Sequence, residues 1–187
     1  MIKVSRRIVF WLLRRLGGAG FANELFSPRL LLWHLFWQKF LRVNSEVPWP
    51  VHMSSRVTHP ANIEKGTRCP GMSPGCYIQG KNGIVFGRNV WLGPGVGIVS
   101  AKHDLADYQV HVPAPPIRIG DDCWIGMNAV VLPGVQLGAH VIVAAGAIVT
   151  HDFPSNCVIA GNPARVIQEL GPYLGKKEVR DTGPSDG

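Results

Sequence analysis

The residue best suited to chemistry in this chain is His103, which lies in the run Ser100-Ala101-Lys102-His103-Asp104. An imidazole has a pKa near neutrality, so it can take a proton from a reacting group and return it at physiological pH. Asp104 follows directly and could orient the imidazole or hold its positive charge. Adjacent residues of an extended chain point in opposite directions, so the partner could also come from elsewhere, including another subunit. The run therefore predicts a general base at position 103, with Asp104 as one candidate partner.

A six-residue repeat surrounds this run. An aliphatic residue returns at every sixth position from 119 onward: Ile119, Ile125, Val131, Leu137, Val143 and Val149. Four places after each comes a mostly small or apolar residue: Cys123, Ala129, Val135, Val141, Ala147 and Phe153. The same spacing occurs earlier in the chain, at Val51, Val57 and Ile63 and at Phe86, Leu92 and Ile98. Hexapeptide repeats of this kind predict short strands stacked into a solenoid.

The spacing also predicts the shape of each coil. Six residues fit one short strand and a corner, so three repeats close a three-sided coil with the aliphatic residue inside. Glycines directly after the aliphatic position, such as Gly120, Gly126 and Gly138, meet the need for close backbone approach at the corners. Two segments break the repeat, residues 69–85 and an extruded loop at 104–118. Because regular coils only provide a scaffold, we expect the chemistry at these breaks.

In its hexapeptide repeat and the run around His103, the chain resembles the hexapeptide-repeat acyltransferases over about residues 51–167. The resemblance is strongest to serine, maltose and galactoside acetyltransferases and to polysaccharide O-acetyltransferases. It implies a mainly β fold, a left-handed parallel β-helix. We expect it to carry an N-terminal helical arm and a short C-terminal helix within 161–170. The domains predicted are a basic arm (1–45), a catalytic β-helix (46–167) and a short cap with a disordered tail (168–187).

The resemblance also implies roles for individual residues. His103 matches the family's catalytic base, and Trp124 matches the aromatic residue that flanks the pantetheine arm of coenzyme A. The stretch around Ala144 resembles the coil edge along which the cofactor lies, and the terminal motif Gly161-Asn162-Pro163-Ala164-Arg165 places a basic residue where it could pair with a phosphate. The residues expected to bind acetyl-CoA are therefore Trp124, Ala145, Gly146, Thr150, Pro163 and Arg165. Plain solenoid packing is the alternative for each of them.

Four further residues are candidates for binding the acceptor. Tyr108 and His111 lie in the extruded loop, and Asn82 and Asn89 are polar residues near the same part of the repeat. Galactoside-type members carry an asparagine on the coil before the catalytic one, whereas here the matching stretch, 72–76, reads Met-Ser-Pro-Gly-Cys. That departure argues against a galactoside-like acceptor.

The net charge of +7 belongs to the N-terminal arm. Residues 1–43 hold eight Lys or Arg against Glu24 alone, and the rest of the chain is balanced. Ser27-Pro28 predicts the start of a second helix, from about Arg29 to Val43. Neither apolar run reaches the roughly 18 to 20 residues that span a bilayer. Basic, Trp-rich helices with short apolar faces favour an anionic membrane surface. Packing on the β-helix or at a subunit interface is the alternative. The many large aliphatic residues between the charges argue against nucleic-acid binding by the arm.

The four cysteines show neither a Cys-x-x-Cys pair nor a histidine at ligand spacing, so we expect reduced thiols, no metal and a cytoplasmic protein. The leading hypothesis is a homotrimeric acetyl-CoA-dependent O-acetyltransferase with sites between subunits. It would act on a sugar of a membrane-linked glycan or exopolysaccharide precursor, at the inner face of the membrane. One alternative is acetylation of a small soluble acceptor, an amino sugar or amino acid. Another is a non-catalytic or zinc-binding β-helix.

Overall fold

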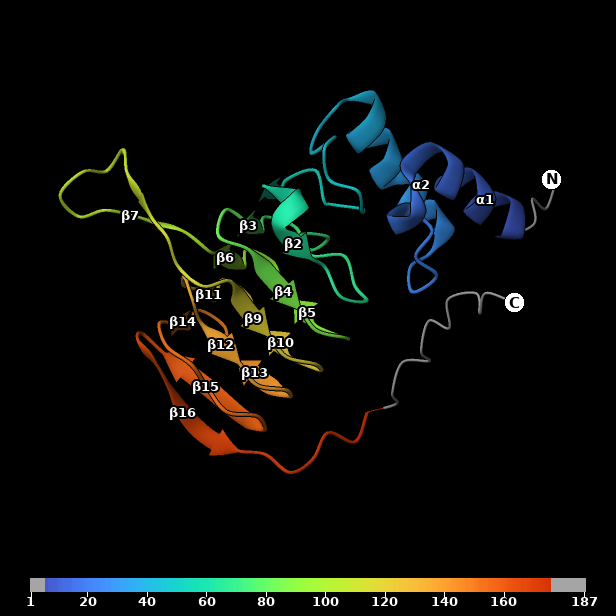
Figure 1. Cartoon of the computed structure of the whole chain (residues 1–187). Coiled ribbons are helices and arrows are strands. Elements are labelled where there is room, and N and C mark those ends of the chain that lie inside the picture. The colour runs from blue at the N-terminus through green and yellow to red at the C-terminus, as the bar shows by residue number, and fades with distance from the viewer. Residues whose placement is uncertain (1–5, 176–187) are drawn as a thin grey trace, which may run out of the picture.

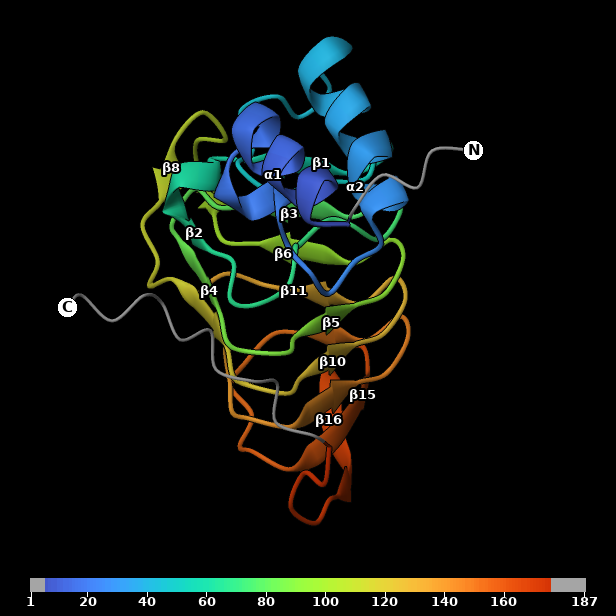
Figure 2. The same cartoon turned by 90° about the vertical axis from the view of Figure 1, so that its right-hand side faces the viewer.

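The structure is a computed structural model that describes residues 6–175. A helical arm lies at one end of a long stack of short strands, and a β-hairpin closes the other end (Figures 1 and 2). Between them the chain winds through three sheets in a fixed order. The first sheet contains β1 (Arg56–Thr58), β3 (Tyr77–Gln79), β6 (Gly97–Val99), β11 (Val130–Val131) and β14 (Ile148–Val149). The second contains β2 (Ile63–Glu64), β4 (Ile84–Phe86), β9 (Ile117–Ile119) and β12 (Gln136–Leu137). The third contains β5 (Trp91–Leu92), β10 (Trp124–Ile125), β13 (Val141–Val143), β15 (Cys157–Gly161) and β16 (Ala164–Glu169).

The hexad prediction is confirmed by what is buried. All six aliphatic residues from Ile119 to Val149 are at most 4% exposed, and the six residues four places later are at most 6% exposed. Strands one coil apart pair in parallel without slip, for example Ile125 beside Leu92 on one side and Val143 on the other. Each aliphatic side chain therefore stacks on its counterpart in the next coil, and full burial of each contributes about 1.5–3 kcal/mol.

Three corners join the sheets, and we name them the first–second, second–third and third–first edges. Gly126, at the third–first edge, illustrates the expected close approach, since a Cβ there would lie 2.7 Å from the backbone nitrogen of Ala145. Corners also use left-handed Asn, Asp and His residues, which the repeat did not predict. Positive φ occurs at His59, Asn89, Asp122, Asn128, His140 and Asn156. Asn and Asp adopt this conformation more readily than other side chains.

The extruded loop leaves the solenoid at the first–second edge, directly after β6. Its base is an antiparallel pair, β7 (Lys102–His103) with β8 (His111–Val112), and the chain rejoins the second sheet at Ile117. Figure 1 shows this hairpin projecting away from the stacked coils. The hairpin overlaps the predicted loop at 104–118 and carries His103 on its first strand.

The predicted short C-terminal helix is wrong. Residues 164–169 form β16, which pairs antiparallel with β15 through contacts such as Arg165 with Ala160. β15 would otherwise leave an open strand edge, and the chain reverses after Gly161, whose φ of 103° suits glycine. Val166 and Ile167 are β-branched and favour the extended form. The tail expected to be disordered lies outside the described residues from position 176 onward.

The arm contains α1 (Arg6–Gly17), a 3-10 turn at Ala19–Phe21, α2 (Pro28–Leu35) and a π-turn at Phe36–Phe40. The Ser27 cap is confirmed, because its hydroxyl accepts a hydrogen bond from the Leu30 N–H at 3.4 Å. The helical segment ends before Val43 because Arg42 adopts a left-handed φ of 59°. A further 3-10 turn, Pro60–Asn62, lies between β1 and β2.

Buried contacts attach the inner side of the arm to the first coil. The Gln38 side chain is fully buried, donates to the carbonyls of Val47 and Trp49, and accepts from the Val51 N–H. The Trp49 indole N–H donates to the Pro70 carbonyl at 2.9 Å. Packing on the β-helix is therefore one property of the arm. No helix in residues 6–175 is long and apolar enough to cross a membrane.

Candidate active site

His103 lies on an exposed strand of the extruded hairpin, directly across from His111. The two residues are register partners, and their ring centroids are 4.1 Å apart. His103 is exposed and His111 is half-buried. The hairpin thus presents two imidazoles side by side, beyond the packed wall of the solenoid, where an acceptor molecule could reach them.

Positive groups surround this pair. Partial desolvation lowers the pKa of His111, and the nearby charges of Lys81, His103 and His59 lower it further. His59 and Lys81 belong to the first–second edges of the two preceding coils. This environment favours the neutral form of the His111 imidazole, one nitrogen of which can accept a hydrogen bond from a neighbour.

Asn82 lies on the same first–second edge as the hairpin. Its backbone N–H donates to the Ser100 hydroxyl at 2.9 Å, and its side-chain amide donates to the Val112 carbonyl at 3.2 Å. Asn82 therefore anchors the second strand of the hairpin to the preceding coil. Tyr108, which is 74% exposed in the loop between β7 and β8, makes no comparable anchor among the described residues.

Asp104 is engaged within the hairpin. Its carboxylate accepts hydrogen bonds from the backbone N–H groups of Ala106 and Asp107, at 2.7 and 3.3 Å, and its own N–H donates to the Val110 carbonyl. In residues 6–175 no hydrogen bond joins it to His103. Its contribution here is to shape the loop that carries the imidazole.

Most of the residues predicted to bind the donor lie together on the third–first edge. Trp124 begins β10 and is 55% exposed, and Ala145 packs over Gly126 on the next coil. The Gly146 N–H donates to the Met127 carbonyl, and a Cβ at Gly146 would meet nothing within 4 Å, so the corner is open. Pro163 and Arg165 lie one coil further along the same edge, in the turn and second strand of the terminal hairpin.

Two predicted residues lie elsewhere. Thr150 follows β14 and so belongs to the first–second edge, where its hydroxyl contacts the His151 ring at 3.0 Å. Asn89 lies on the second–third edge and is 7% exposed. The chain therefore does not place Asn89 beside His103.

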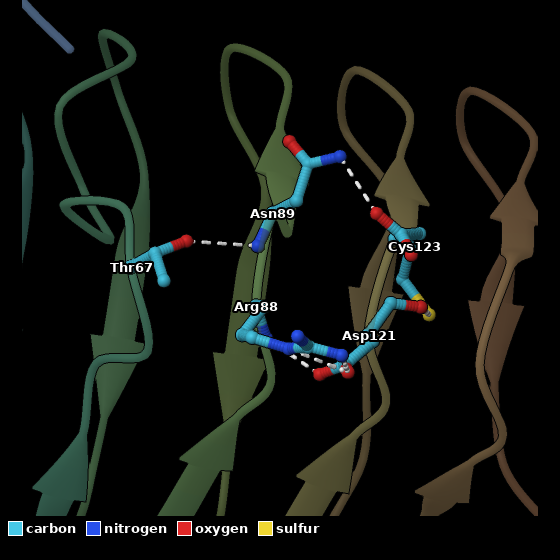
Figure 3. A network of polar contacts seen from close by, with 6 residues as sticks. Thr67, Arg88, Asn89, Asp121 and Cys123 are labelled. Carbon is cyan, nitrogen blue, oxygen red and sulfur yellow. Dashed lines mark hydrogen bonds and ion pairs between the residues drawn. The ribbon is translucent and has the colours of Figure 1, made fainter. Parts of the chain in front are cut away.

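Asn89 instead belongs to a structural network that ties neighbouring coils together (Figure 3). Its N–H donates to the Thr67 hydroxyl at 2.9 Å and its amide donates to Asp122 at 2.8 Å. Arg88 forms an ion pair with Asp121 in the same layer. Desolvation raises the pKa of Asp121, but hydrogen bonds from Arg88 outweigh it, and the pKa lies below its usual value.

Trp91 is a neighbour of the predicted donor residue Trp124 that the sequence reasoning did not consider. It is 52% exposed and pairs in register with Trp124, so the two indoles are neighbours on the outer face of the third sheet. The Arg68 guanidinium carbon lies 3.4 Å from the centre of the Trp91 ring. The hexapeptide repeat could have identified Trp91, because Trp91 precedes Leu92 just as Trp124 precedes Ile125.

The buried thiols take no part in this arrangement. Cys69, Cys76, Cys123 and Cys157 are free and buried, and burial raises the pKa of Cys123 to about 12. Within residues 6–175 no cluster of three or more His, Cys, Asp or Glu side chains could hold a metal ion.

Comparison with known proteins identifies the repeat. Residues 116–151 match the family model described as bacterial transferase hexapeptide (six repeats). These residues therefore carry the hexapeptide repeat of that transferase family. The structure superposes on a galactoside acetyltransferase in complex with coenzyme A with a TM-score of 0.60, at 23% identity, over 96% of this chain and 92% of the other. The expected left-handed β-helix is thereby confirmed.

Two further proteins to which the chain is similar are named for different acceptors. A maltose O-acetyltransferase from Clostridium difficile 630 is 32% identical over 63% of this chain and 64% of its own, with a TM-score of 0.52. A 2,3,4,5-tetrahydropyridine-2,6-dicarboxylate N-acetyltransferase from Staphylococcus aureus is 43% identical over 51% of this chain and 35% of its own. The chain spans less than half the length of the curated relatives it matches.

Proposed function

We propose that this protein is an acetyl-CoA-dependent O-acetyltransferase that acts on a sugar hydroxyl, with His103 as general base. The observation that carries the proposal is the extruded hairpin, which presents His103 in the open with His111 across from it. The maltose O-acetyltransferase among the similar structures supports the reaction class.

Transfer of an acetyl group from a thioester to a hydroxyl requires mainly a general base from the protein. His103 would take the proton of the acceptor hydroxyl as its oxygen attacks the thioester carbonyl, and the C–S bond would break as the acetyl ester forms. The imidazolium would return the proton to the leaving thiolate, which gives free coenzyme A and neutral His103. No covalent enzyme intermediate is needed because the thioester is already activated. Asp104 and Asn82 would act as positioning residues that hold the hairpin.

The third–first edge fits the donor. The exposed face of Trp124 can pack against a thin pantetheine chain, and the open corner at Ala145 and Gly146 leaves room for it. Arg165, exposed at the far end of the edge, would pair with a phosphate of the donor. Pro163 remains a predicted contact on this edge, whereas Thr150 lies on the first–second edge.

The positions of these residues favour a trimer with shared sites. The base lies on the first–second edge and the donor contacts on the third–first edge, so the whole first sheet separates them within one chain. A neighbouring copy related by three-fold symmetry could place its hairpin against the donor edge of the first. The site would then be complete only between subunits.

The outer side of the arm supports a membrane-linked acceptor. Ile8, Trp11 and Leu16 are each more than half exposed on α1. The same helix carries four arginines: Arg6, Arg7, Arg14 and Arg15. Apolar and cationic side chains together suit an anionic bilayer surface. We infer peripheral association with the inner face of the membrane, where a lipid-linked glycan or exopolysaccharide precursor would be presented.

A second candidate function is acetylation of a small soluble amine, such as an amino sugar or amino acid. The observation that favours it is the similarity to the Staphylococcus aureus N-acetyltransferase. The same hairpin base would serve, since an ammonium group must also lose a proton before attack.

The test is transfer by purified full-length protein, followed by release of free thiol from acetyl-CoA with panels of sugar and amine acceptors. His103→Ala should lower turnover about 10² to 10⁴-fold and leave acetyl-CoA affinity unchanged. His140→Asn is the matched control, because His140 lies on the second–third edge and asparagine tolerates its φ of 55°. Near-normal turnover by His103→Ala would disprove the assignment, and preference for amines would favour the second candidate.

A further inference from the structure

A cavity of about 330 Å³ lies between the arm and the second coil, on the side of the third sheet. The arm contributes Phe26 and Leu30, and the irregular segment 69–85 contributes Met72. The wall of the solenoid adds Phe86, Val90 and Leu92. Its volume falls in the range of small-molecule sites, and these side chains make it predominantly apolar.

Two cations, Lys65 and Arg68, line the same cavity. Both charges act on Cys69, which also lines the cavity. Burial raises the pKa of the Cys69 thiol to about 11, while the charges of Lys65 and Arg68 lower that pKa. Arg68 is held in place, because its guanidinium stacks on Trp91 and donates to the Asn89 amide oxygen at 2.9 and 3.2 Å. An ordered cation beside an apolar cavity is a preorganised anion contact.

The neutral polar groups of the wall are already satisfied. The Ser73 hydroxyl donates to the Leu92 carbonyl, and the Trp91 indole N–H donates to the Asn89 side chain at 2.9 Å. A sugar ring placed here would have to bury hydroxyl groups without partners, which is costly. Lys65, by contrast, has three donors, of which the Gly66 carbonyl accepts one at 3.2 Å. The lining suits an apolar chain that ends in an anionic group.

We propose that this cavity binds a lipid phosphate, with the hydrocarbon chain between Leu30 and Met72 and the phosphate on Lys65 and Arg68. Leu30 is 41% exposed on α2 and lines the cavity, so the cavity reaches the surface of the arm. The inference deepens the proposed function, because a lipid phosphate is the anchor by which a glycan would be held at a membrane. Binding of the anchor itself requires neither acetyl-CoA nor turnover.

The experiment is calorimetry on the full-length protein with three water-soluble probes: octyl phosphate, octanol and inorganic phosphate. Octyl phosphate should bind at least tenfold more tightly than either of the others, because it alone satisfies both parts of the cavity. Lys65→Ala should lower octyl phosphate affinity about tenfold or more and leave octanol unchanged. Leu30→Gln should weaken both octyl phosphate and octanol. Lys39→Ala, a lysine of the arm outside the cavity, is the control.

Inorganic phosphate binding as tightly as octyl phosphate would mean a free-phosphate site and would overturn the proposal. So would unchanged affinity in both cavity variants, provided that their melting temperatures match the wild type. The two proposals fail separately. Octyl phosphate binding without transfer to any acceptor removes only the proposed enzyme, and transfer to soluble sugars without octyl phosphate binding removes only the lipid site.

Discussion

Two adjacent residues of β10 should respond to truncation in opposite ways. Ile125 is fully buried between Leu92 and Val143, whereas Trp124 is 55% exposed on the other face of the strand. Ile125→Ala removes a core side chain from a stack that cannot collapse, because the backbones of neighbouring coils already touch at Gly126. The free energy of unfolding should fall by about 2–5 kcal/mol. For a chain of this size that corresponds to a drop in Tm of roughly 5–15 °C.

Trp124→Ala should leave Tm within a few degrees and weaken acetyl-CoA instead. If pantetheine covers about 50 Å² of the exposed indole, the lost contact is about 1.3 kcal/mol, or roughly tenfold in Kd. Differential scanning calorimetry and titration with acetyl-CoA measure the two effects separately. A Trp124→Ala variant that melts as low as Ile125→Ala and binds acetyl-CoA normally would refute the reasoning and return the outer tryptophan to packing.

Three further predictions concern the ends of the molecule. Arg165→Ala should weaken acetyl-CoA binding with a much smaller effect on turnover at saturating donor, and unchanged affinity in titration calorimetry would contradict its role at a phosphate. Trp11→Ser with Leu16→Ser should abolish co-sedimentation with anionic vesicles at low salt. Leu174→Ser, which changes an even more exposed apolar residue outside the arm, should not, and equal sedimentation of the two variants would exclude α1 as the membrane contact. Burial and then the charge of His52 lower the pKa of His34 in the folded protein below the 6.5 of the unfolded chain, so the unfolded chain binds more protons and the free energy of unfolding should fall as pH drops through 6.5. Denaturant unfolding at several pH values should show a smaller fall for His34→Leu. A pH dependence equal to that of the wild type would contradict the prediction.

The repeat made the solenoid predictable because one period fixes both the strand and the side chain that faces inward. The same logic would have identified Trp91, since its place in the hexad equals that of Trp124. The terminal strand β16 was not predictable from local pattern. Residues 164–169 form a strand because β15 offers an unpaired edge, which is a property of the folded neighbour and not of the segment.

The predicted site residues show a similar limit. The sequence analysis placed both Asn82 and Asn89 near His103. Position in the repeat tells which edge of the solenoid a residue occupies, and in the structure only Asn82 shares the edge of the hairpin. It does not tell what a side chain already binds. Asp104 closes a turn within the hairpin, which lies outside the repeat, and Asn89 ties three coils together through its bonds to Thr67 and Asp122.

Packing and membrane binding appeared as competing explanations of the arm because both require apolar residues at helical spacing. The structure assigns different residues to different faces. Leu13, Leu31 and Gln38 are buried against the arm's own core or the first coil, while Ile8, Trp11 and Leu16 face outward beside the arginines. Deleting residues 1–45 would remove the buried Gln38 contacts together with the outer face, so loss of vesicle binding in such a truncation could reflect damage to the first coil. Substitution of the outer residues alone tests the membrane without disturbing the contacts that hold the arm in place.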